Sequence, residues 1–570
     1  MKSIPKFVTE RNVVIKQQGK IFGFIYPATY DIAMAGMTGI TLANLVNSLA
    51  TWRFERIFLP WNPSIEPNSM ENGLTLSNMD IIGFTSQFEP NYLIVGWMLK
   101  KAKIPLNNIA RKTSKQTFPP LFVGGPCAGA NPFPLLDFVD GFFLGDAENS
   151  LPTFLKLVDE KGIEEFWKSP TVFNEIKGFW TPHALESHEK SYSKLFKDKL
   201  FEEIAGEWYS RFDFVDLNAT PYPMQQTFCT LPTHHPYAPV KGQTFQLEIG
   251  RGCSHTCRFC MIGSGMFSPA RYRSLERLLE IVQEGLLLTE VNKVDIFGMN
   301  LSDFSQLNDL CWALVNDGIE VSIATLRPDK VSQDIIEAVH KGGQSKLTIA
   351  PETGTDRLRS ALCKQISNDQ VLEATKIIFE TGIPTLKNFF LTGLPNETEG
   401  DRKAIIELVK EQLKIAESSD VKDPLIKVDI NPMVPKWQTP LKSWVYFFLP
   451  ENRIQFQEIL IELRTQLNTI PHMKPKEVSF NGFLAQTWLT HLEDPINMLF
   501  ESLPLKSHAP LSVHGGHYYL SSFQNYLDDI LKSTWNKFKT NHWKVSHRVR
   551  ATNRSDEEFT KQYTLLIDHL

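Results

Sequence analysis

Short apolar stretches alternate with stretches of helical length along the first 150 residues of the chain. The apolar stretches lie at residues 21–26, 56–59, 81–85, 121–124 and 141–144. Segments long enough for helices, such as residues 39–51 and 92–103, lie between them. Strands that alternate with helices are typical of a parallel sheet covered by helices. We therefore predict an α/β fold here, a Rossmann-like doubly wound parallel sheet over residues 1–150.

A second alternation of the same kind begins at residue 245. Strand-like stretches lie at residues 245–250, 293–298, 320–326, 346–350, 387–392 and 426–432. Helical stretches lie between them at residues 275–289, 334–341, 368–381 and 401–416. This pattern predicts an open, partial (β/α)6 barrel over residues 241–445. As in closed barrels, we expect the chemistry at the carboxyl ends of the strands.

Two regions carry weaker patterns. Residues 151–240 include charged and proline-rich segments and are predicted to form a linker region. Residues 446–570 are predicted to be mainly helical, with the clearest helices at 452–468 and 523–538. His514 and His517 share one loop without an acidic or cysteine partner, so we predict a turn there rather than a metal site.

Composition narrows the class of protein. The chain has 570 residues, 42% of them hydrophobic, which suggests about three or four domains with sizeable cores. Its 59 basic and 64 acidic residues give a net charge of −5, which gives no clear indication of nucleic-acid binding. Seven cysteines at low density fit a reducing compartment. Because no signal peptide and no run of about 18 apolar residues is present, we expect a cytoplasmic protein without a membrane partner.

Three cysteines form the most informative motif. Cys253, Cys257 and Cys260 follow a strand-like stretch and lie in a glycine-rich loop, at C-x3-C-x2-C spacing. This spacing can place three thiolates on three irons of a cubane cluster and leave the fourth iron open to a ligand. Two alternatives are a zinc site completed by His255 and a group of buried thiols. Both are disfavoured, because His255 lies between the cysteines and buried structural thiols have no reason to cluster in such a loop.

The cysteine loop resembles that of the radical S-adenosylmethionine (radical SAM) superfamily, and Phe259 fills the aromatic place before the family's third cysteine. The resemblance implies a [4Fe-4S] cluster held by Cys253, Cys257 and Cys260. It also implies that the open iron binds the amino and carboxylate groups of S-adenosyl-L-methionine (SAM).

Further residues at the predicted strand ends resemble SAM-binding segments of the same superfamily. Arg327 is expected to meet a carboxylate, Glu352 to lie near the sulfonium, and the Gly393 backbone to approach the adenosine. Many members carry Gly-Gly-Glu after the second strand, where it contacts the SAM amino group. This chain departs from that motif, and Gly298 and Asn300 are expected to take over the contact. Trp437 lies in a segment that resembles a barrel-closing stretch beside the substrate, so substrate contact and packing both stay open for it.

Three short motifs of the first 150 residues are Tyr26-Pro-x-x-Tyr30, Gly124-Gly-Pro126 and Gly145-Asp-x-Glu148. With them, this part of the chain resembles the cobalamin-binding domain of cobalamin-dependent radical SAM enzymes. The residues that this resemblance implies for cobalamin are Tyr30, Ser86, Gln87, Gly124, Gly125, Gly145 and Glu148. The Asp-x-His-x-x-Gly motif is absent and the first histidine is His183, so no histidine of this domain is expected on the cobalt. The alternative is a Rossmann-like scaffold that binds no cobalamin. Cys127 is expected to pack at the end of the fourth strand.

The resemblance implies a cobalamin-dependent radical SAM methyltransferase that methylates an unactivated carbon through a 5′-deoxyadenosyl radical and methylcobalamin. Alternatives are a non-methylating radical SAM rearrangement, cyclisation or coupling, and a non-catalytic iron–sulfur redox or platform protein. Methylthiotransferases carry three further upstream cysteines, whereas this chain has only Cys127 and Cys229 upstream. The expected partners are a reductant such as flavodoxin or ferredoxin and a substrate that is either a protein side chain or a small molecule. The sequence does not identify catalytic residues.

Overall fold

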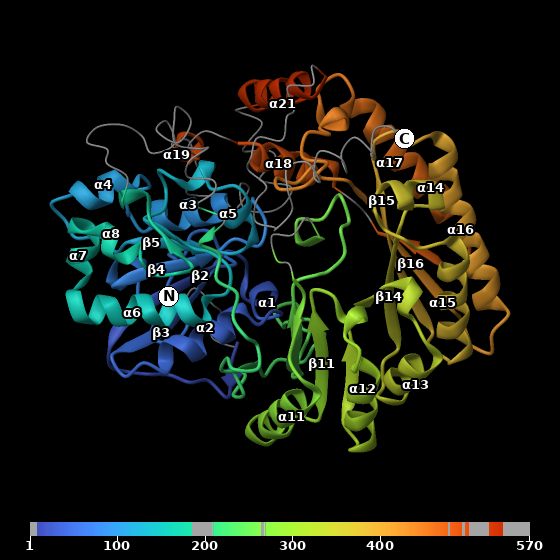
Figure 1. Cartoon of the computed structure of the whole chain (residues 1–570), viewed down its shortest axis with the longest axis horizontal. Helices are drawn as coiled ribbons and strands as arrows, with labels where there is room; N and C mark the ends of the chain where they lie inside the picture. The colour runs from blue at the N-terminus through green and yellow to red at the C-terminus, as the bar shows by residue number, and fades with distance from the viewer. Residues whose placement is uncertain are drawn as a thin grey trace. The chain divides into compact units, whose positions relative to one another are not determined.

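The computed structural model describes residues 8–184, 208, 210–263, 267, 269–476, 479–492, 496–500 and 524–539. These residues belong to two compact units (Figure 1). The first unit includes residues within 8–243 and 484–530, and the second includes residues within 244–483 and 531–545. The four-part division expected from the sequence stays a prediction.

The first unit is built on a mainly parallel sheet. Its strands are β2 (Lys20–Tyr26), β3 (Trp52–Phe58), β4 (Ile81–Thr85), β5 (Leu121–Gly124), β6 (Gly141–Phe143) and β7 (Phe179–Trp180). They lie in the order β3-β2-β4-β5-β6-β7, and only β7 runs antiparallel to its neighbour. This order confirms the doubly wound sheet and reverses between β2 and β4. Sheets of this kind bind ligands at the carboxyl ends of the strands beside such a reversal.

Helices cover both faces of this sheet. Helices α2 (Thr38–Asn47) and α6 (Ala147–Lys161) pack on one face, and α3 (Asn91–Lys101) and α5 (Pro126–Ala130) lie on the other (Figure 1). The core under α2 and α6 is aromatic, with the rings of Phe122 and Phe154 at 4.9 Å between centroids. Smaller elements are β1 (Glu10–Arg11), α1 (Tyr30–Ala33), η1 (Leu76–Asn78), α4 (Asn108–Thr113), η2 (Phe133–Leu135), α7 (Ile163–Lys168), α8 (Pro170–Phe173), η3 (Pro182–Ala184) and β8 (Phe228–Cys229).

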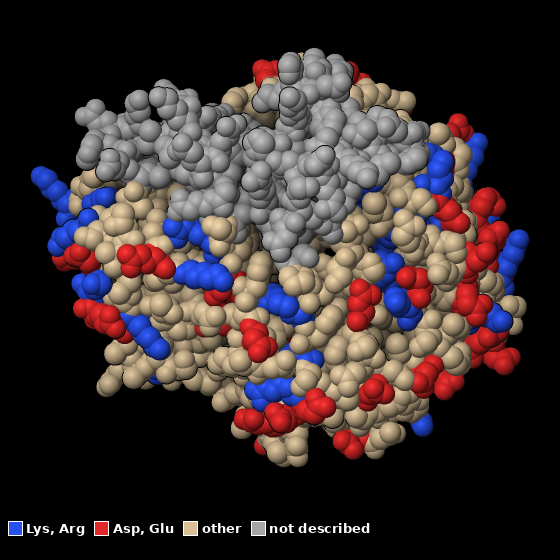
Figure 2. Space-filling model, viewed as in Figure 1, with Lys and Arg blue, Asp and Glu red and all other residues tan. Residues whose placement is uncertain are grey.

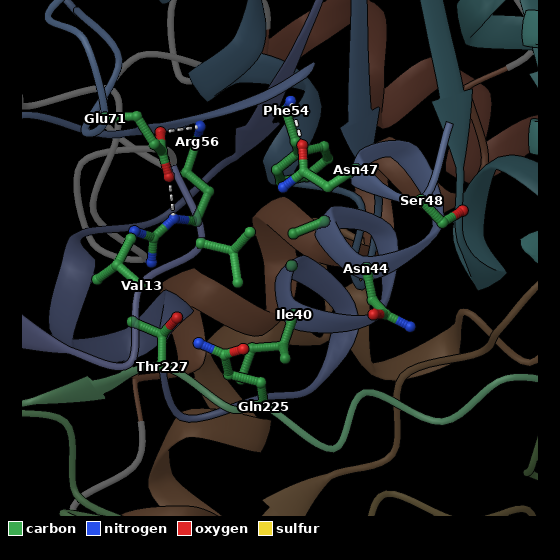
Figure 3. Close-up of a pocket in the computed structure, with 13 residues that line it drawn as sticks. Val13, Ile40, Asn44, Asn47, Ser48, Phe54, Arg56, Glu71, Gln225 and Thr227 are labelled. Carbon is green, nitrogen blue, oxygen red and sulfur yellow. Dashed lines mark hydrogen bonds and ion pairs between the residues drawn. The ribbon is translucent and has the colours of Figure 1, made fainter. Parts of the chain in front are cut away.

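The outer strand β3 has side chains as partners for its free backbone groups. The Phe54 N–H donates to Asn47 Oδ1 at 3.0 Å, and the Arg56 N–H donates to Glu71 Oε2 at 2.6 Å (Figure 3). The Arg56 guanidinium also contacts Glu71 and Glu10, at 2.5 and 2.7 Å. These contacts satisfy edge groups that would otherwise be free to pair with another chain.

The second unit is an open barrel of parallel strands. The strands are β9 (Phe245–Arg251), β11 (Lys293–Gly298), β12 (Glu320–Ile323), β13 (Thr325–Leu326), β14 (Lys346–Glu352), β15 (Thr385–Thr392), β16 (Leu425–Pro432) and β17 (Met473–Pro475), with β10 (Arg271–Tyr272) antiparallel to β9. The stretch predicted as one strand over 320–326 is divided at Ala324. The Ala324 N–H still donates to Ile296 O at 3.3 Å, whereas β13 pairs with β14. The partial barrel is therefore confirmed as two hydrogen-bonded sheets.

Two of the barrel helices begin with a capping box. Ser367 and Thr398 each form a reciprocal capping box at the start of α15 (Asn368–Glu380) and α16 (Glu399–Glu417). Helices α13, α15 and α16 lie along the outer side of strands β14 to β16 (Figure 1). The other helices are α11 (Leu275–Thr289), η6 (Leu301–Asp303), α12 (Leu307–Asn316), η7 (Pro328–Lys330), α13 (Gln333–Lys341), α14 (Asp356–Ala361), η8 (Tyr446–Phe448) and α17 (Arg453–Asn468).

The last helices are α18 (Phe480–Thr490), α19 (Asn497–Phe500) and α21 (Gln524–Lys539). The predicted helices at 452–468 and 523–538 correspond to α17 and α21. The predicted turn at His514 and His517 lies outside the described residues. Among the helices that the structure describes, none is long and apolar enough to cross a membrane.

One glycine in the barrel sets how closely a helix approaches a strand end. A Cβ at Gly354 would lie 2.3 Å from Ile405 N in α16, so we expect Gly354→Ala to displace α16 and cost about 1–3 kcal/mol. Gly400 is the matched control, because a Cβ there would meet only Thr398 Oγ1, at 3.5 Å. Gly400→Ala should be neutral or stabilising by up to about 1 kcal/mol. Urea unfolding midpoints measure both, and equal midpoints for the two variants would contradict the packing argument.

Candidate functional site

The three cysteines lie in a loop that starts at the carboxyl end of β9. Gly252 begins it with a φ of +83°, and a Cβ there would lie 2.1 Å from Phe267 O, so only glycine fits. Cys253, Cys257 and Cys260 form no disulfide and are partly exposed. The Cys253 Sγ accepts a hydrogen bond from the His255 N–H at 3.4 Å. The loop therefore presents three thiols at the edge where the sequence predicts chemistry.

Burial disfavours the thiolate form of these side chains. It raises the pKa of Cys253 and Cys260, and it raises the pKa of Cys257 to about 12. Nearby positive charges act in the opposite direction: Arg327 lowers the pKa of Cys253 and Cys257, and Lys364 lowers the pKa of Cys257 and Cys260. A metal that binds thiolates must displace these protons, so its own charge has to offset the burial.

The same interactions show which strand ends meet at the cysteine loop. Glu352 at the end of β14 interacts with Cys257 and Cys260, and Asp303 after β11 interacts with Cys253. The barrel thus brings the predicted residues Arg327 and Glu352 together with the cysteines. Asp303 and Lys364 join them, and the sequence analysis did not single out either residue.

The donor set suits a cluster better than a single ion. Among the described residues, no three His, Cys, Asp or Glu side chains converge on one metal ion. His255, the candidate fourth ligand of a zinc site, has its Nε2 2.9 Å from Asp303 Oδ2. A cubane cluster binds each thiolate at a different iron, so its ligands need not converge on one point. Three thiols without disulfide bonds in one short loop therefore fit the predicted [4Fe-4S] cluster.

Glu352 is held in an unusual backbone conformation. Its φ is +67°, in the left-handed region, which costs about 1–3 kcal/mol for a residue other than glycine. The fully buried Arg359 donates from Nε to Pro351 O at 3.1 Å and from Nη2 to Thr353 O at 3.0 Å. Because these carbonyls belong to the neighbours of Glu352, one guanidinium fixes the chain on both sides of it.

The Glu352 side chain is buried and has a cationic partner. Its Oε1 accepts from Lys364 Nζ at 2.6 Å, and the two residues are 9% and 5% exposed. Lys364 lies beyond α14, twelve residues after Glu352. No sequence pattern predicts the pair, because the helix between them determines where Lys364 falls. Glu352 as a SAM contact stays a prediction.

Arg258, inside the cysteine loop, attaches that loop to the end of α14. Its N–H donates to Leu362 O at 3.0 Å, and its Nη1 donates to Ala361 O at 2.7 Å. The next residue, Phe259, packs against a buried cluster of Leu358, Leu362, Leu394, Met433 and Leu441. This packing gives the aromatic residue a structural role, and its role toward SAM stays a prediction.

The residues after β11 form a polar group. Gly298 pairs with Gly250 of β9, and a Cβ at Gly298 would lie 3.0 Å from Gly250 O. Asn300 donates from Nδ2 to Asp303 Oδ2 at 2.6 Å, and its carbonyl accepts from the Tyr272 hydroxyl at 2.7 Å. The side chain of Asn300 is therefore directed at a carboxylate. The predicted contacts of Gly298 and Asn300 with SAM are untested.

The remaining predicted SAM and substrate residues already have partners within the chain. Arg327 contacts Asp329 at 3.0 and 3.1 Å. Gly393, with a φ of +85°, donates to Glu397 Oε2 at 2.6 Å, and its carbonyl accepts from Trp444 Nε1 at 2.9 Å. Trp437 is 8% exposed and has the Lys442 ammonium 5.4 Å from its ring centroid, which favours packing. Their functional roles stay predictions.

In the first unit, Ser86, Gln87, Gly124 and Gly125 gather at the carboxyl ends of β4 and β5. Gly125 has a φ of +106°, and a Cβ there would lie 2.7 Å from Ser86 O, so the two loops cross closely. Ser86 is fully buried, whereas Gln87 is exposed and donates to Thr85 Oγ1 at 2.9 Å. Cys127 is 2% exposed and its N–H lies 3.3 Å from Ser86 O, in keeping with packing.

The other residues predicted to bind cobalamin are Tyr30, Gly145 and Glu148. Tyr30 is fully buried and its hydroxyl donates to Glu10 Oε1 at 2.9 Å. A Cβ at Gly145 would lie 2.1 Å from Asp213 O, so this glycine allows a close backbone approach. Glu148 is 8% exposed in the first turn of α6. These contacts give the three residues structural roles, and contact with a cofactor stays a prediction for each.

His183 lies at the edge of the sheet opposite to these loops. Its Nε2 is 3.0 Å from Asp140 Oδ1, and Asp140 immediately precedes β6. Burial lowers the pKa of His183, and Arg111 pairs with the same aspartate at 3.0 Å. The histidine therefore belongs to a structural group at the amino end of β6, away from the carboxyl edge.

A separate cavity of about 220 Å³ lies along α2 in the first unit (Figure 3). It is lined by apolar Val13 and Ile40 and by the amides of Asn44 and Gln225. Arg56, whose charge is paired with Glu10 and Glu71, also lines it. It runs beside the outer strand β3 and contains none of the predicted cofactor residues. On the face shown in Figure 2, acidic and basic side chains are interspersed.

The Arg359 network predicts a large loss of stability on substitution. Arg359→Met would leave buried carbonyls without a donor, and we expect a cost of about 3 kcal/mol or more. Arg357 is the control, because its side chain is 43% exposed in its pair with Asp401 and Arg357→Ala should cost less than about 1 kcal/mol. Denaturant unfolding of both variants measures this, and similar losses would contradict a special role for Arg359.

The buried carboxyl group of Glu397 is expected to make the free energy of unfolding depend on pH. Burial raises its pKa from 4.5 to about 6, although the Gly393 N–H favours the carboxylate. The folded protein then binds more protons than the unfolded chain between these values, so stability falls as the pH rises through 4.5 to 6. The Glu397→Gln variant should not show this loss of stability, which amounts to about 2 kcal/mol in the native protein. Unfolding midpoints at pH 4.5 and 6.5 compare the two proteins, and parallel pH profiles would refute the assignment.

Comparisons with known proteins agree with this geometry. Residues 39–182 match the family model described as "Radical SAM proteins, N-terminal", and residues 247–409 match "Radical SAM superfamily". An uncharacterized protein of Methanocaldococcus jannaschii is 27% identical over 442 residues, which cover 77% of this chain and 83% of that protein. The tRNA-2-methylthio-N(6)-dimethylallyladenosine synthase of Roseobacter denitrificans is 27% identical over 184 residues, 29% of this chain and 40% of that enzyme.

A solved structure shares the fold. It is the radical S-adenosylmethionine methyltransferase TsrM of Kitasatospora setae with cobalamin and a [4Fe-4S] cluster bound. The TM-score is 0.52 at 10% identity, and the match covers 91% of this chain and 99% of that one. This chain therefore belongs to the radical SAM superfamily, and its fold is similar to that of a radical SAM methyltransferase.

Proposed function

We propose that this radical SAM enzyme is a cobalamin-dependent methyltransferase that acts on an unactivated carbon. The observation that carries the proposal is that the three cysteine thiols lie near Arg327 and Glu352 at the carboxyl edge of the barrel. Cys253, Cys257 and Cys260 would hold a [4Fe-4S] cluster. Arg327, Glu352 and the Gly393 backbone are the proposed SAM contacts, with Phe259, Gly298 and Asn300 beside them.

The chemistry belongs to the bound groups. When present, the cluster, SAM and cobalamin supply radical generation and methyl transfer. The chain's own part is to orient them: Gly252 forms the turn into the cysteine loop, Arg258 fastens this loop to α14, and Arg359 fixes Glu352.

Support for cobalamin comes from the first unit. The strand order reverses between β2 and β4, and the loops at that edge include Ser86 and Gln87. His183 lies at the amino end of β6, which is the opposite edge of this sheet. We infer that cobalamin would bind at the carboxyl edge without a histidine ligand from this sheet. The fold neighbour TsrM binds cobalamin and a [4Fe-4S] cluster, which is in line with this.

The methylthiotransferase relatives suggest a different reaction, but the match with them covers 40% of the Roseobacter denitrificans enzyme. Cys127 and Cys229, the upstream cysteines of this chain, are both buried and form no disulfide. Buried single thiols do not offer the second set of three cysteines. We therefore favour methyl transfer, with a reductant such as flavodoxin or ferredoxin as electron source.

The cluster is tested by single cysteine substitutions after anaerobic reconstitution with iron and sulfide. Cys253→Ala, Cys257→Ala and Cys260→Ala should each lose most of the bound iron and the release of 5′-deoxyadenosine from SAM. Cys127→Ala is the control, because this buried thiol lies in the first unit, and it should retain both. Iron content and product analysis are the measurements. Full iron binding by all three variants would overturn the proposal.

Cobalamin is tested separately with the intact chain. Incubation with hydroxocobalamin followed by gel filtration should leave corrinoid absorption on the protein, and Gly125→Val should abolish it, because its side chain would meet Ser86 O. If 5′-deoxyadenosine forms but no corrinoid binds, the enzyme carries out a radical SAM reaction without methyl transfer. If neither occurs, the cluster has a non-catalytic role.

A further inference from the structure

The ion pair of Lys364 and Glu352 is buried beside the cysteine loop. The Nζ to Oε1 distance is 2.6 Å, and the side chains are 7% and 11% exposed. Arg258, the residue after Cys257, donates to the carbonyls of Ala361 and Leu362, so the segment that leads to Lys364 is fastened to the loop itself. The segment that carries Lys364 is therefore attached directly to the cysteine loop.

Two residues at the ion pair have backbone conformations in the left-handed region. Glu352 has a φ of +67° and Cys363, which precedes Lys364, has a φ of +55°. Left-handed residues other than glycine persist only where the surroundings fix them. Arg359 fixes one side through the carbonyls of Pro351 and Thr353. Two strained residues thus place a buried lysine and a buried glutamate next to the thiols, at positions that ordinary backbone would not give.

We propose that Lys364 is a positioning residue whose buried positive charge raises the reduction potential of the cluster, with the Glu352 carboxylate as the opposing charge. The inference rests on the proposed function, because it requires a cluster on Cys253, Cys257 and Cys260. A cluster gains negative charge on reduction, so a fixed cation nearby favours the reduced form and a fixed anion disfavours it. Both groups interact with Cys257 and Cys260, with opposite signs.

The two charges predict opposite results when each is removed. Lys364→Met should shift the potential of the reconstituted cluster to a more negative value, because Glu352 is left without its cation. Glu352→Gln should shift it to a more positive value, because the ammonium remains. The double variant should lie between the two single variants. Anaerobic redox titration without SAM, followed by electron paramagnetic resonance of the reduced cluster, measures these potentials.

Two controls separate charge from structure. Lys364→Arg keeps the cation and should leave the potential close to that of the native protein. Lys387→Met makes the same substitution in another ion pair of this unit, with Asp429 at 2.8 Å and towards the amino ends of β15 and β16. It should leave the potential unchanged, because chemistry in this fold lies at the opposite ends.

Equal shifts in the same direction for Lys364→Met and Glu352→Gln would show that the pair acts only as a structural support and would overturn the inference. So would the absence of any shift beyond that of Lys387→Met. If Lys364→Met takes up no cluster, Glu352→Gln decides, because it keeps the lysine and must raise the potential. If the native chain binds no iron, the proposed function itself fails, which is a different outcome.

Discussion

The buried guanidinium of Arg359 is the interaction on which the end of β14 depends. It donates to the carbonyls before and after Glu352 and to Asp356, and these acceptors lie in three different parts of one tight segment. Buried carbonyls without donors are costly, and the fixed fork of a guanidinium serves several of them at once. Because Arg359 holds this segment, Glu352 keeps its left-handed conformation and Lys364 meets it.

Charge around the cysteine loop is arranged in compensating pairs. Glu352 faces Lys364 and Asp329 faces Arg327, so burial does not leave an isolated charge at either place. Burial raises the pKa of the three thiols, and the charges of Arg327 and Lys364 offset this only in part. A metal that binds the thiolates has to replace their protons. A cofactor that contacts Arg327 or Gly393 exchanges hydrogen bonds that the chain now makes internally.

Much of the architecture followed from hydrophobic periodicity. The predicted strands at 81–85, 121–124 and 293–298 and the helix at 275–289 have the observed bounds. The stretch at 320–326 is divided because its two parts pair with different neighbours, which local pattern does not reveal. Lys364, Arg359 and Asp303 were missed for a related reason. Lys364 meets Glu352 across helix α14, Arg359 donates back to the carbonyls of Pro351 and Thr353, and Asp303 lies against His255 of the cysteine loop, so these partners come together only in the fold.

The sequence by itself determined the cysteine loop, its place after a strand, and the strand ends that carry Arg327 and Glu352, because parallel strands bring their carboxyl ends to one edge. Only the tertiary structure decided which of the predicted site residues already have hydrogen-bond or packing partners within the protein. Tyr30 donates to Glu10, Gly145 lies against Asp213, and Gly393 binds Glu397 and Trp444. The physical reason is that burial and hydrogen-bond partners come from segments far apart in the chain, whose approach the fold alone sets.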